Sequence, residues 1–349
     1  LLLAACASTE PSPSAAPQKN EVKMGAIVPL GRFGGAGAQK KAEYLNGFYL
    51  AAGEINKESP DIKLSFLMAD ADENNLPAQF DAMKKSGVKI FHIGSTNAVA
   101  QNLNFLERQN QGSILINFLC EYAPAVVRVK NSVRLRPNTA TICEKMASII
   151  PRAQNRGGSI IILSSNDFFG KSAAAYMKYQ TGSEGYAIRH VEYKTGDFRF
   201  DALADAAIQT EPKFLIFYGE DEALAPLLKS LKNKNFGGAV ISNAEPGESA
   251  LKNAEGLSLY YIKRSLKRTE KNAEFFDKYQ KLHKRPPSPE AAEAYDSAKL
   301  LFYAYKKSGF DAKAARESLL NSRQSLAEGV VRIDSCGDSE SALSLEKAD

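Results

Sequence analysis

Short apolar runs alternate along most of the chain with stretches whose apolar residues recur at helical spacing. The first such unit has an apolar run at residues 22–30, a glycine-rich segment to residue 37 and then a helical pattern. The five apolar positions of the expected helix are Tyr44, Phe48, Ala51, Ala52 and Ile55. The pattern predicts a buried parallel strand, an exposed loop and a covering helix. Ligands of open α/β sheets bind outside the carboxyl ends of the strands, so we expect the loop at 30–37 to border a cleft.

The same unit repeats in two consecutive runs, at roughly 22–135 and 136–250. Further strands are expected at 62–68, 88–93, 113–118, 131–136, 159–163, 187–193, 214–218 and 239–242. The remainder has a different order, with a strand at 256–262, helices at 270–284, 290–307 and 312–321, and a last strand at 329–333. Helices that follow two complete sheets indicate that the chain returns to finish its first domain.

Length and composition are those of an ordinary two-domain globular protein. The chain has 349 residues, of which 44% are hydrophobic and 24% charged. Its net charge of +5 comes from 45 basic and 40 acidic residues spread along the chain, without a basic run or a nucleic-acid motif. We therefore expect no nucleic-acid partner. No apolar stretch approaches the ~20 residues of a membrane span.

The amino-terminal residues indicate export. The sequence begins with Leu1–Leu3, two alanines and Cys6, an order typical of the end of an apolar signal segment. It resembles a bacterial lipobox, whose cysteine carries lipid after processing. Residues 7–20 are rich in Pro, Ser and Ala and predict a flexible tether. We expect lipid on Cys6 to hold the folded part at a membrane of the bacterial cell envelope, on its periplasmic or extracellular face.

Several motifs that would indicate metal or cofactor chemistry are incomplete. The acidic loop at 69–75 lacks the later glycine and glutamate of an EF-hand, and Cys120, Cys143 and Cys336 match no zinc spacing. The glycine-rich segment at 31–37 reads G-x-x-G-G-x-G, which is neither a dinucleotide fingerprint nor a phosphate-binding loop. We expect no metal, no cofactor and no catalytic residues, although an enzyme stays open as an alternative.

The order and chemistry of the strand ends resemble those of a known family. The motifs are residues 25–30 (GAIVPL), 47–56 (GFYLAAGEIN), 93–96 (IGST), 167–170 (DFFG) and 333–338 (IDSCGD). Together they resemble the type I periplasmic-binding-protein fold, and most closely the branched-chain amino-acid (Leu/Ile/Val)-binding lipoproteins of ABC importers. The resemblance spans residues 22–349.

This resemblance implies an α/β protein of two lobes, each a mainly parallel sheet flanked by helices. It implies three hinge crossovers, which we place near 135–138, 249–256 and 326–329. Lobe 1 is then expected to comprise 21–135 plus 251–327, and lobe 2 to comprise 136–250 plus 328–349. The chain would be a monomer that captures a small polar ligand between closing lobes and delivers it to an ABC permease.

The resemblance also assigns roles to loop residues. In amino-acid-binding relatives, the groups that match Ser95 and Thr96 hold the ligand carboxylate, and an acidic residue of the second lobe, here Glu245, holds the amine. The loop after the fourth strand, with Phe118, Leu119 and Glu121, also contributes. Glu121 departs from the small residues and threonine usual there, and its carboxylate would repel a ligand carboxylate.

Other candidate binding residues follow from their place at strand ends. Arg32 is a possible anion anchor as well as a possible surface residue, and Phe33 follows it in the first loop. Aromatic side chains would line an apolar part of the pocket, and carboxylates would favour a cationic or amine-bearing ligand. The aromatic set is Phe33, Phe118, Phe168, Phe169 and Tyr218, and the acidic set is Glu121, Asp167, Glu220 and Glu245.

Two non-enzymatic functions remain open at this point. The leading hypothesis is a solute-binding lipoprotein of an ABC importer, which predicts release of the ligand to a permease. The alternative is a ligand-sensing or regulatory envelope lipoprotein on the same fold, which predicts that another envelope protein retains the liganded form.

Overall fold

The computed structural model describes residues 20–28, 36–70, 72, 74–110, 112–151, 158–182, 185–264, 266–340 and 343–348. Cys6 with the tether before residue 20, and Arg32 and Phe33 in the first loop, lie outside the described residues. The predictions made for these three side chains therefore stay predictions.

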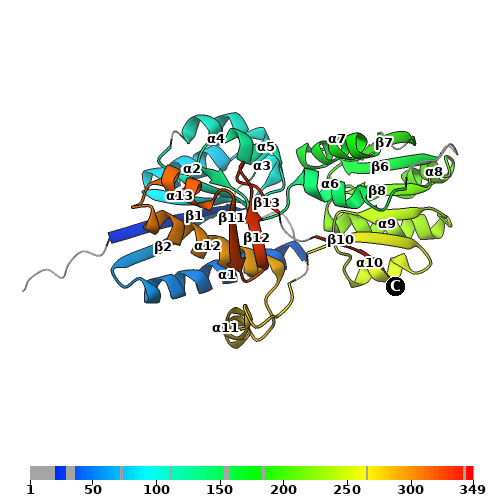
Figure 1. Cartoon of the computed structure of the whole chain (residues 1–349). Coiled ribbons are helices and arrows are strands. Elements are labelled where there is room, and N and C mark those ends of the chain that lie inside the picture. The colour runs from blue at the N-terminus through cyan, green and yellow to red at the C-terminus, as the bar shows by residue number, and fades with distance from the viewer. Residues whose placement is uncertain are drawn as a thin grey trace, which may run out of the picture.

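The chain forms two lobes that lie side by side (Figure 1). Lobe 1 is built on a parallel sheet in the order β2-β1-β3-β4-β5. Its strands are β1 (Asn20–Val28), β2 (Ile62–Asp70), β3 (Val88–Ile93), β4 (Leu115–Phe118) and β5 (Ser132–Val133). Because side chains alternate along a strand, Met24, Ala26 and Val28 of β1 enter the core on one face while Ile27 enters the core on the other.

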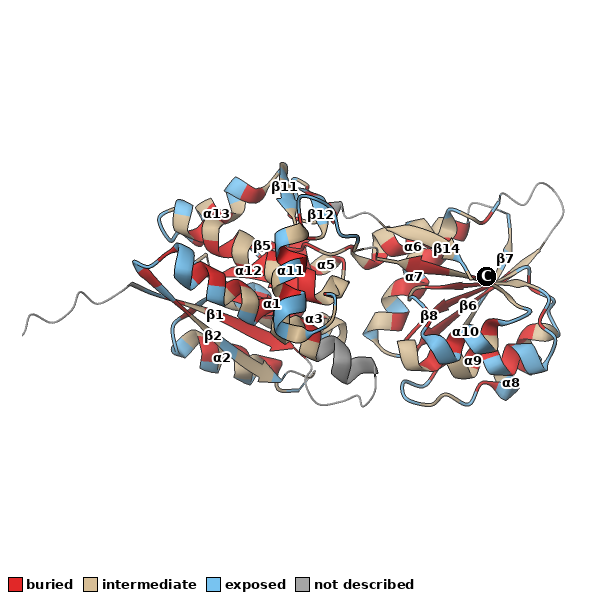
Figure 2. Cartoon of the chain, turned by 90° about the horizontal axis from the view of Figure 1, so that it is seen from below, coloured by how far each residue is buried: buried red, intermediate tan, exposed pale blue. Residues whose placement is uncertain are grey.

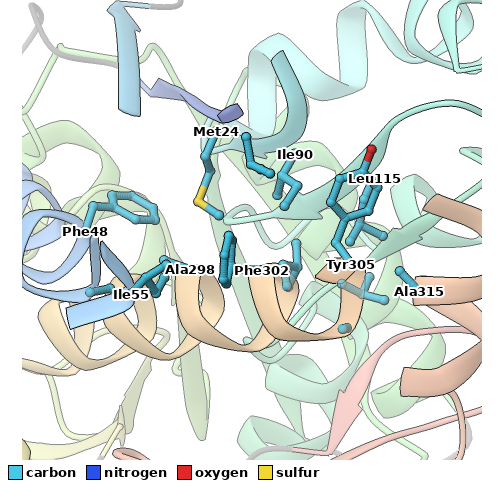
Figure 3. Packing of buried hydrophobic residues seen from close by; sticks show 14 of the residues in the cluster. Met24, Phe48, Ile55, Ile90, Leu115, Ala298, Phe302, Tyr305 and Ala315 are labelled. Atoms are coloured by element: carbon cyan, nitrogen blue, oxygen red, sulfur yellow. The ribbon is translucent and has the colours of Figure 1, made fainter. Parts of the chain in front are cut away.

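Helices cover both faces of the lobe 1 sheet. One face packs against α1 (Ala36–Glu58), α12 (Pro289–Lys307) and α13 (Ala312–Leu319). The other packs against α2 (Leu76–Lys85), α3 (Thr96–Gln101), α4 (Leu103–Gln109) and α5 (Pro124–Arg128). Figure 3 shows the first of these cores, in which Phe48 and Ile55 of α1 lie near Ala298 and Phe302 of α12, beneath Met24 of the sheet.

Lobe 2 has the same layered plan. Its sheet has the order β14-β10-β9-β8-β6-β7, and β14 is its antiparallel strand. The strands are β6 (Ser159–Ser165), β7 (Ala187–Tyr193), β8 (Phe214–Tyr218), β9 (Ala239–Ser242), β10 (Ser258–Lys263) and β14 (Ser344–Lys347). The helices are α6 (Thr139–Ala147) and α7 (Phe168–Gly182) on one face, and α8 (Asp201–Ile208), α9 (Asp221–Asn233) and α10 (Glu248–Ala254) on the other. Buried strands between half-exposed helices are visible in Figure 2.

Two further parts adjoin lobe 1. A small antiparallel sheet contains β11 (Ser322–Leu326), β12 (Gly329–Ile333) and β13 (Ser339–Glu340), and Ile333 enters the lobe 1 core. Helix α11 (Ala273–His283) projects below lobe 1 in Figure 1 and packs through Phe275 and Tyr279 against α12.

The chain changes lobes at places that differ in part from the sequence prediction. The first change, at residues 134–138, coincides with the expected crossover near 135–138. The prediction was wrong to place 251–263 in lobe 1, because β10 pairs with β9 of lobe 2 and the chain leaves that lobe only after Lys263. It was also wrong to place β12 in lobe 2, since only β14, after β13, returns to the lobe 2 sheet.

The architecture confirms the predicted fold class, two mainly parallel sheets flanked by helices. Every strand expected in the two repeated runs is present, with ends that move by a few residues. Among the described residues, no helix combines the length and the apolar character needed to cross a bilayer.

Candidate ligand-binding cleft

A cleft of about 1450 Å³ lies at the carboxyl ends of the strands, with walls from both lobes. Lobe 1 contributes residues 94–97 after β3 and Glu121 after β4. Lobe 2 contributes residues 166–169 after β6, 219–222 after β8 and 243–247 after β9. The cleft therefore lies where parallel sheets of this type hold their ligands.

Ser95 and Thr96 line the lobe 1 wall, and both hydroxyl oxygens already accept a hydrogen bond. Ser95 is the N-cap of α3, and its Oγ accepts from the backbone N–H of Ala98 at 3.2 Å. Oγ1 of Thr96 accepts from the backbone N–H of Glu121 at 3.4 Å. This contact brings the loops after β3 and β4 together, so Thr96 and Glu121 are neighbours in the wall.

Glu121 also joins the two lobes. Its Oε2 accepts a hydrogen bond of 2.7 Å from the hydroxyl of Tyr218 in β8, and its Oε1 lies 3.6 Å from Nη2 of Arg136. Burial raises the pKa of Tyr218, so this phenol stays protonated and able to donate. Glu121 is thereby held in place by one group from lobe 2 and one from the first crossover.

A second interlobe contact joins α3 to the start of α7. The side-chain amide of Asn97 donates to Oδ2 of Asp167 at 2.9 Å, and its oxygen accepts from the backbone N–H of Phe169 at 2.9 Å. Asp167 also accepts from Ser165, Thr195 and the N–H of Gly170. Asp167 is a well-satisfied carboxylate that connects the lobes.

Glu220, at the N-cap of α9, is bonded less completely. Its Oε2 accepts a short hydrogen bond from the hydroxyl of Tyr193, whereas its buried Oε1 has no hydrogen-bond partner among the described residues. Burial raises the pKa of Glu220, and the nearby charges of Asp167 and Glu222 add to this effect.

Glu245, the residue expected to hold a ligand amine, has a partner from its own lobe. Its Oε1 lies 3.2 Å from Nζ of Lys263 at the end of β10, which also contacts Glu346 of β14. Because β9 and β10 are adjacent parallel strands, their carboxyl ends bring these two side chains together.

Ion pairs tie the connecting segments together beside the cleft. Arg136 of the first crossover and Arg264 of the second both approach Glu293 on α12, at 3.9 Å and 3.1 Å. Arg264 also pairs with Glu328 at 2.6 Å. These contacts place two guanidinium groups in the cleft wall, each already facing carboxylates of lobe 1.

A separate buried pair holds the first crossover against the segment before β13. Nε of Arg134 lies 3.2 Å from Oδ1 of Asp338, and the side chain of Arg134 is fully buried. Asn138 donates to the other oxygen of Asp338 at 3.1 Å, and the backbone N–H of Arg134 donates to the carbonyl of Gly337. Arg134 and Asp338 therefore fix where the lobes join.

The structure brings together seven of the sequence-predicted site residues in the cleft wall. They are Ser95, Thr96, Glu121, Asp167, Phe169, Glu220 and Glu245. Phe118, Leu119 and Tyr218 are buried instead, in the lobe cores, although the hydroxyl of Tyr218 reaches Glu121. Phe168, at the mouth, also lines the cleft.

Sequence reasoning missed several residues of the wall. Those with polar side chains include Asn97, Arg136, Thr195, Asn243 and Arg264. Asn97 and Asn243 were detectable, because each lies in a strand-end loop that the pattern had already identified. Arg136 and Arg264 gave no local signal, since their positions depend on where the chain changes lobes.

The described residues give no indication of an inorganic site. No group of three or more His, Cys, Asp or Glu side chains within the described ranges is arranged to hold a metal ion. Cys120, Cys143 and Cys336 are free thiols, the first two buried and the third exposed.

Comparisons with solved structures agree with this architecture. The leucine-binding protein of Thermotoga maritima superposes with a TM-score of 0.74 at 17% identity, over 94% of this chain and 98% of that one. A solute-binding protein of an ABC transporter from R. palustris, in complex with benzoate, gives 0.76 at 12% identity, over 95% and 94%. The isoleucine complex of a branched-chain amino-acid substrate-binding protein from Streptococcus pneumoniae gives 0.72 at 14% identity, over 93% and 95%.

At these identities the structures show a shared fold. No curated protein matches the chain in a sequence comparison. The family model described as "Periplasmic binding protein" matches residues 21–333, which is most of the chain. Proteins of this family bind solutes and are not catalysts, in agreement with the interpretation of the chain as a binding protein. The chain belongs to the periplasmic binding protein family.

Proposed function

We propose that this protein is the solute-binding component of an ABC importer and captures a small polar solute, an amino acid or a related metabolite. The observation that carries the proposal is the cleft of about 1450 Å³ whose walls come from two lobes joined by crossing segments. Structural neighbours that bind leucine, isoleucine or benzoate support it, because they share this two-lobed fold.

Capture would occur by closure of the lobes around the solute. The interlobe bonds from Asn97 to Asp167 and from Tyr218 to Glu121 lie beside the cleft and can act as contacts of a closed state. A ligand that contacts both walls stabilises that state over an open one, and closure changes the surface offered to a membrane partner.

The partner in this proposal is an ABC permease, and the protein acts as a monomer. Its site in the cell envelope would be set by lipid on Cys6, with residues 7–20 as the tether, because small residues precede this cysteine and a Pro- and Ser-rich segment follows it. Radiolabelled palmitate incorporated by the wild type but not by Cys6→Ala would support the anchor, and equal labelling would oppose it.

The proposal is tested by identifying a bound solute. Native mass spectrometry of protein purified without refolding should show a small-molecule adduct that exchanges when candidate metabolites are added. The same solute should raise the melting temperature, since it binds the folded state alone. Membranes that carry the cognate permease should then take up the solute only when the protein is present. Detectable chemical turnover of the solute, or retention without uptake, would refute the importer function.

A further inference from the structure

The charge of the cleft wall is strongly one-sided. Among the described residues that line the cleft there are eight carboxylates and two guanidinium groups. The carboxylates are those of Asp72, Glu121, Asp167, Glu220, Asp221, Glu222, Glu245 and Glu290, and the guanidinium groups are those of Arg136 and Arg264. A low-dielectric cleft lined by one sign of charge raises the local concentration of ions of the opposite sign.

The two arginines offset this charge only in part, because each of them already faces two carboxylates of the protein. Arg136 donates to the carbonyl of Leu119 at 2.6 Å and faces Glu121 and Glu293. Arg264 donates to Glu293 and to Glu328. Nε of Arg136 has no hydrogen-bond partner among the described residues, but Glu121 and Glu293 lie 3.6 Å and 3.9 Å from this guanidinium, so a ligand carboxylate there would have to share it with two carboxylates of the protein.

The lobe 1 wall is also unfavourable for a ligand carboxylate. The backbone N–H of Glu121 donates to Oγ1 of Thr96, so the Glu121 residue lies directly against the loop expected to hold such a group. Glu121 lines the cleft beside Ser95 and Thr96, so an anion bound at these two residues would meet a negative charge on the same wall. Like charges at short range in a partly desolvated site repel each other strongly.

Of the four cleft carboxylates predicted from the sequence, Glu220 is the best placed to meet a cation. Asp167 accepts four hydrogen bonds, Glu121 is held by Tyr218 and Arg136, and Glu245 pairs with Lys263. In contrast, Oε1 of Glu220 is buried and has no hydrogen-bond partner among the described residues, and this side chain lines the cleft.

The backbone supports this role for Glu220. It occupies the N-cap of α9, a helix of 13 residues, where the positive end of the helix dipole favours an ionised carboxyl. Its other oxygen is fixed by the hydroxyl of Tyr193, which orients the carboxyl group. Burying a carboxylate oxygen without a partner is costly, and a cation from the ligand removes that cost.

We infer that the solute captured by this cleft is an organic cation, an ammonium or guanidinium compound, and that Glu220 is its charge partner. The inference rests on the proposed solute-binding function and narrows its ligand class. It separates this chain from the structural neighbour that binds benzoate.

The test compares matched probes that differ in their charged groups. Isopentylamine, leucine and 4-methylpentanoate share a five-carbon isopentyl unit that carries an ammonium, an ammonium and a carboxylate, or a carboxylate, in that order, and benzylamine and benzoate form a second set. Agmatine and putrescine extend the cationic class. Dissociation constants are measured by isothermal titration calorimetry on the dialysed full chain at neutral pH.

The variant Glu220→Gln removes the charge but keeps the shape and can still accept from Tyr193. Glu248→Gln is the control, because Glu248 also lies in the first turn of a lobe 2 helix but is exposed and outside the cleft wall. Loss of a charge-assisted hydrogen bond should weaken binding of a cationic probe at least tenfold in Glu220→Gln. Glu248→Gln should bind as the wild type does.

Each outcome decides the matter. Binding of a cationic probe with the expected loss in Glu220→Gln supports the inference. Tighter binding of leucine or of an anion than of the matched amine overturns the ligand class and leaves the solute-binding function standing. Equal binding of a cation by wild type and Glu220→Gln overturns the role of Glu220. If no probe binds, the co-purified solute decides: a neutral or anionic mass overturns the inference, a cationic mass supports it, and absence of any adduct counts against both proposals.

Discussion

Helices α1 and α12 approach so closely at Gly47 that one added methyl group should destabilise lobe 1. A Cβ atom built on Gly47 would lie 2.1 Å from the carbonyl oxygen of Ala291 and 2.9 Å from Cβ of Ala294. Since real Cβ contacts essentially never fall under 3.0 Å, the oxygen would have to move by roughly 1 Å. It belongs to the backbone of α12, so no side-chain rotation can relieve the contact.

Two opposing terms set the size of the effect of Gly47→Ala. Overpacking of this kind costs about 1–3 kcal/mol and sometimes more. Replacing a glycine inside a helix by alanine contributes about 1 kcal/mol in the other direction. Because the clash is with rigid backbone, we place the cost at the upper end and expect a net loss of about 1–2 kcal/mol in the free energy of unfolding.

The same helix provides a matched control. Gly53 is exposed, and nothing lies within 4 Å of a Cβ built on it. Gly53→Ala should therefore show the propensity term alone and stabilise the protein by about 0.5–1 kcal/mol.

The assay is urea denaturation followed by far-ultraviolet circular dichroism at 25 °C. The free energy of unfolding should fall by about 3 kcal/mol per molar urea. The urea midpoint of Gly47→Ala should therefore lie roughly 0.5 M below that of the wild type, and the midpoint of Gly53→Ala should lie slightly above it. A midpoint for Gly47→Ala at or above that of the wild type would refute the close packing of α1 on α12. An equal fall in both variants would refute the attribution to the contact with Ala291.

Three further predictions concern the hinge and the interlobe contacts. Asn97→Asp places a carboxylate against Asp167, so the lobes should separate and the radius of gyration from X-ray scattering should rise; an unchanged radius would oppose this. Asp338→Asn leaves the buried charge of Arg134 without its partner and should cost about 3 kcal/mol in urea unfolding, and a loss under about 1 kcal/mol would contradict the pairing. Burial raises the pKa of Asp296 from 3.8 to about 8, so the folded protein binds more protons than the unfolded chain between these values. The free energy of unfolding should therefore fall as pH rises from 6 to 8, by up to about 1.4 kcal/mol per pH unit relative to Asp296→Asn. The same pH dependence of this free energy in the wild type and in Asp296→Asn would disprove the prediction.

The sequence predicted the strands that lie deep in a sheet. β3, β8 and β9 begin and end where their apolar runs do, because β-branched and aromatic side chains there fill the space between sheet and helices. The edge strands β2 and β7 were also predicted, from apolar or alternating runs, but the edge strands β11 and β14 gave no such signal. β11 reads SRQSL and β14 reads SLEK, and their polar side chains remain partly exposed.

The lobe to which a strand belongs was harder to predict than the strand itself. An apolar run indicates burial, but it does not indicate which neighbour provides the backbone hydrogen bonds. β10 illustrates this, since the run at 256–262 was correctly read as a strand and assigned to the wrong lobe. The order of the earlier units suggested that lobe 2 was complete, whereas it still required β10 and β14.

That error extended into the candidate site. With β10 in lobe 2 beside β9, Lys263 stands at the same sheet edge as Glu245 and neutralises it, so Glu245 is not a free partner for a ligand amine. Sequence reasoning identified the correct loops, because parallel strands place their carboxyl ends at one edge. It could not predict which of the carboxylates in those loops is free to bind a ligand, because this depends on which cationic side chain of the protein lies beside each one.

The crossovers connect this charge pattern to lobe movement. Arg136 precedes α6 of lobe 2 and Arg264 follows β10 of lobe 2, yet both face Glu293 on α12 of lobe 1. A rotation of lobe 2 must therefore turn about segments whose guanidinium groups are held by lobe 1 carboxylates. Those carboxylates hold the two arginines in the cleft wall. The negative charge of the cleft then depends on the loops that the rotation brings together, chiefly the loop of Glu220 in lobe 2 and that of Glu121 in lobe 1.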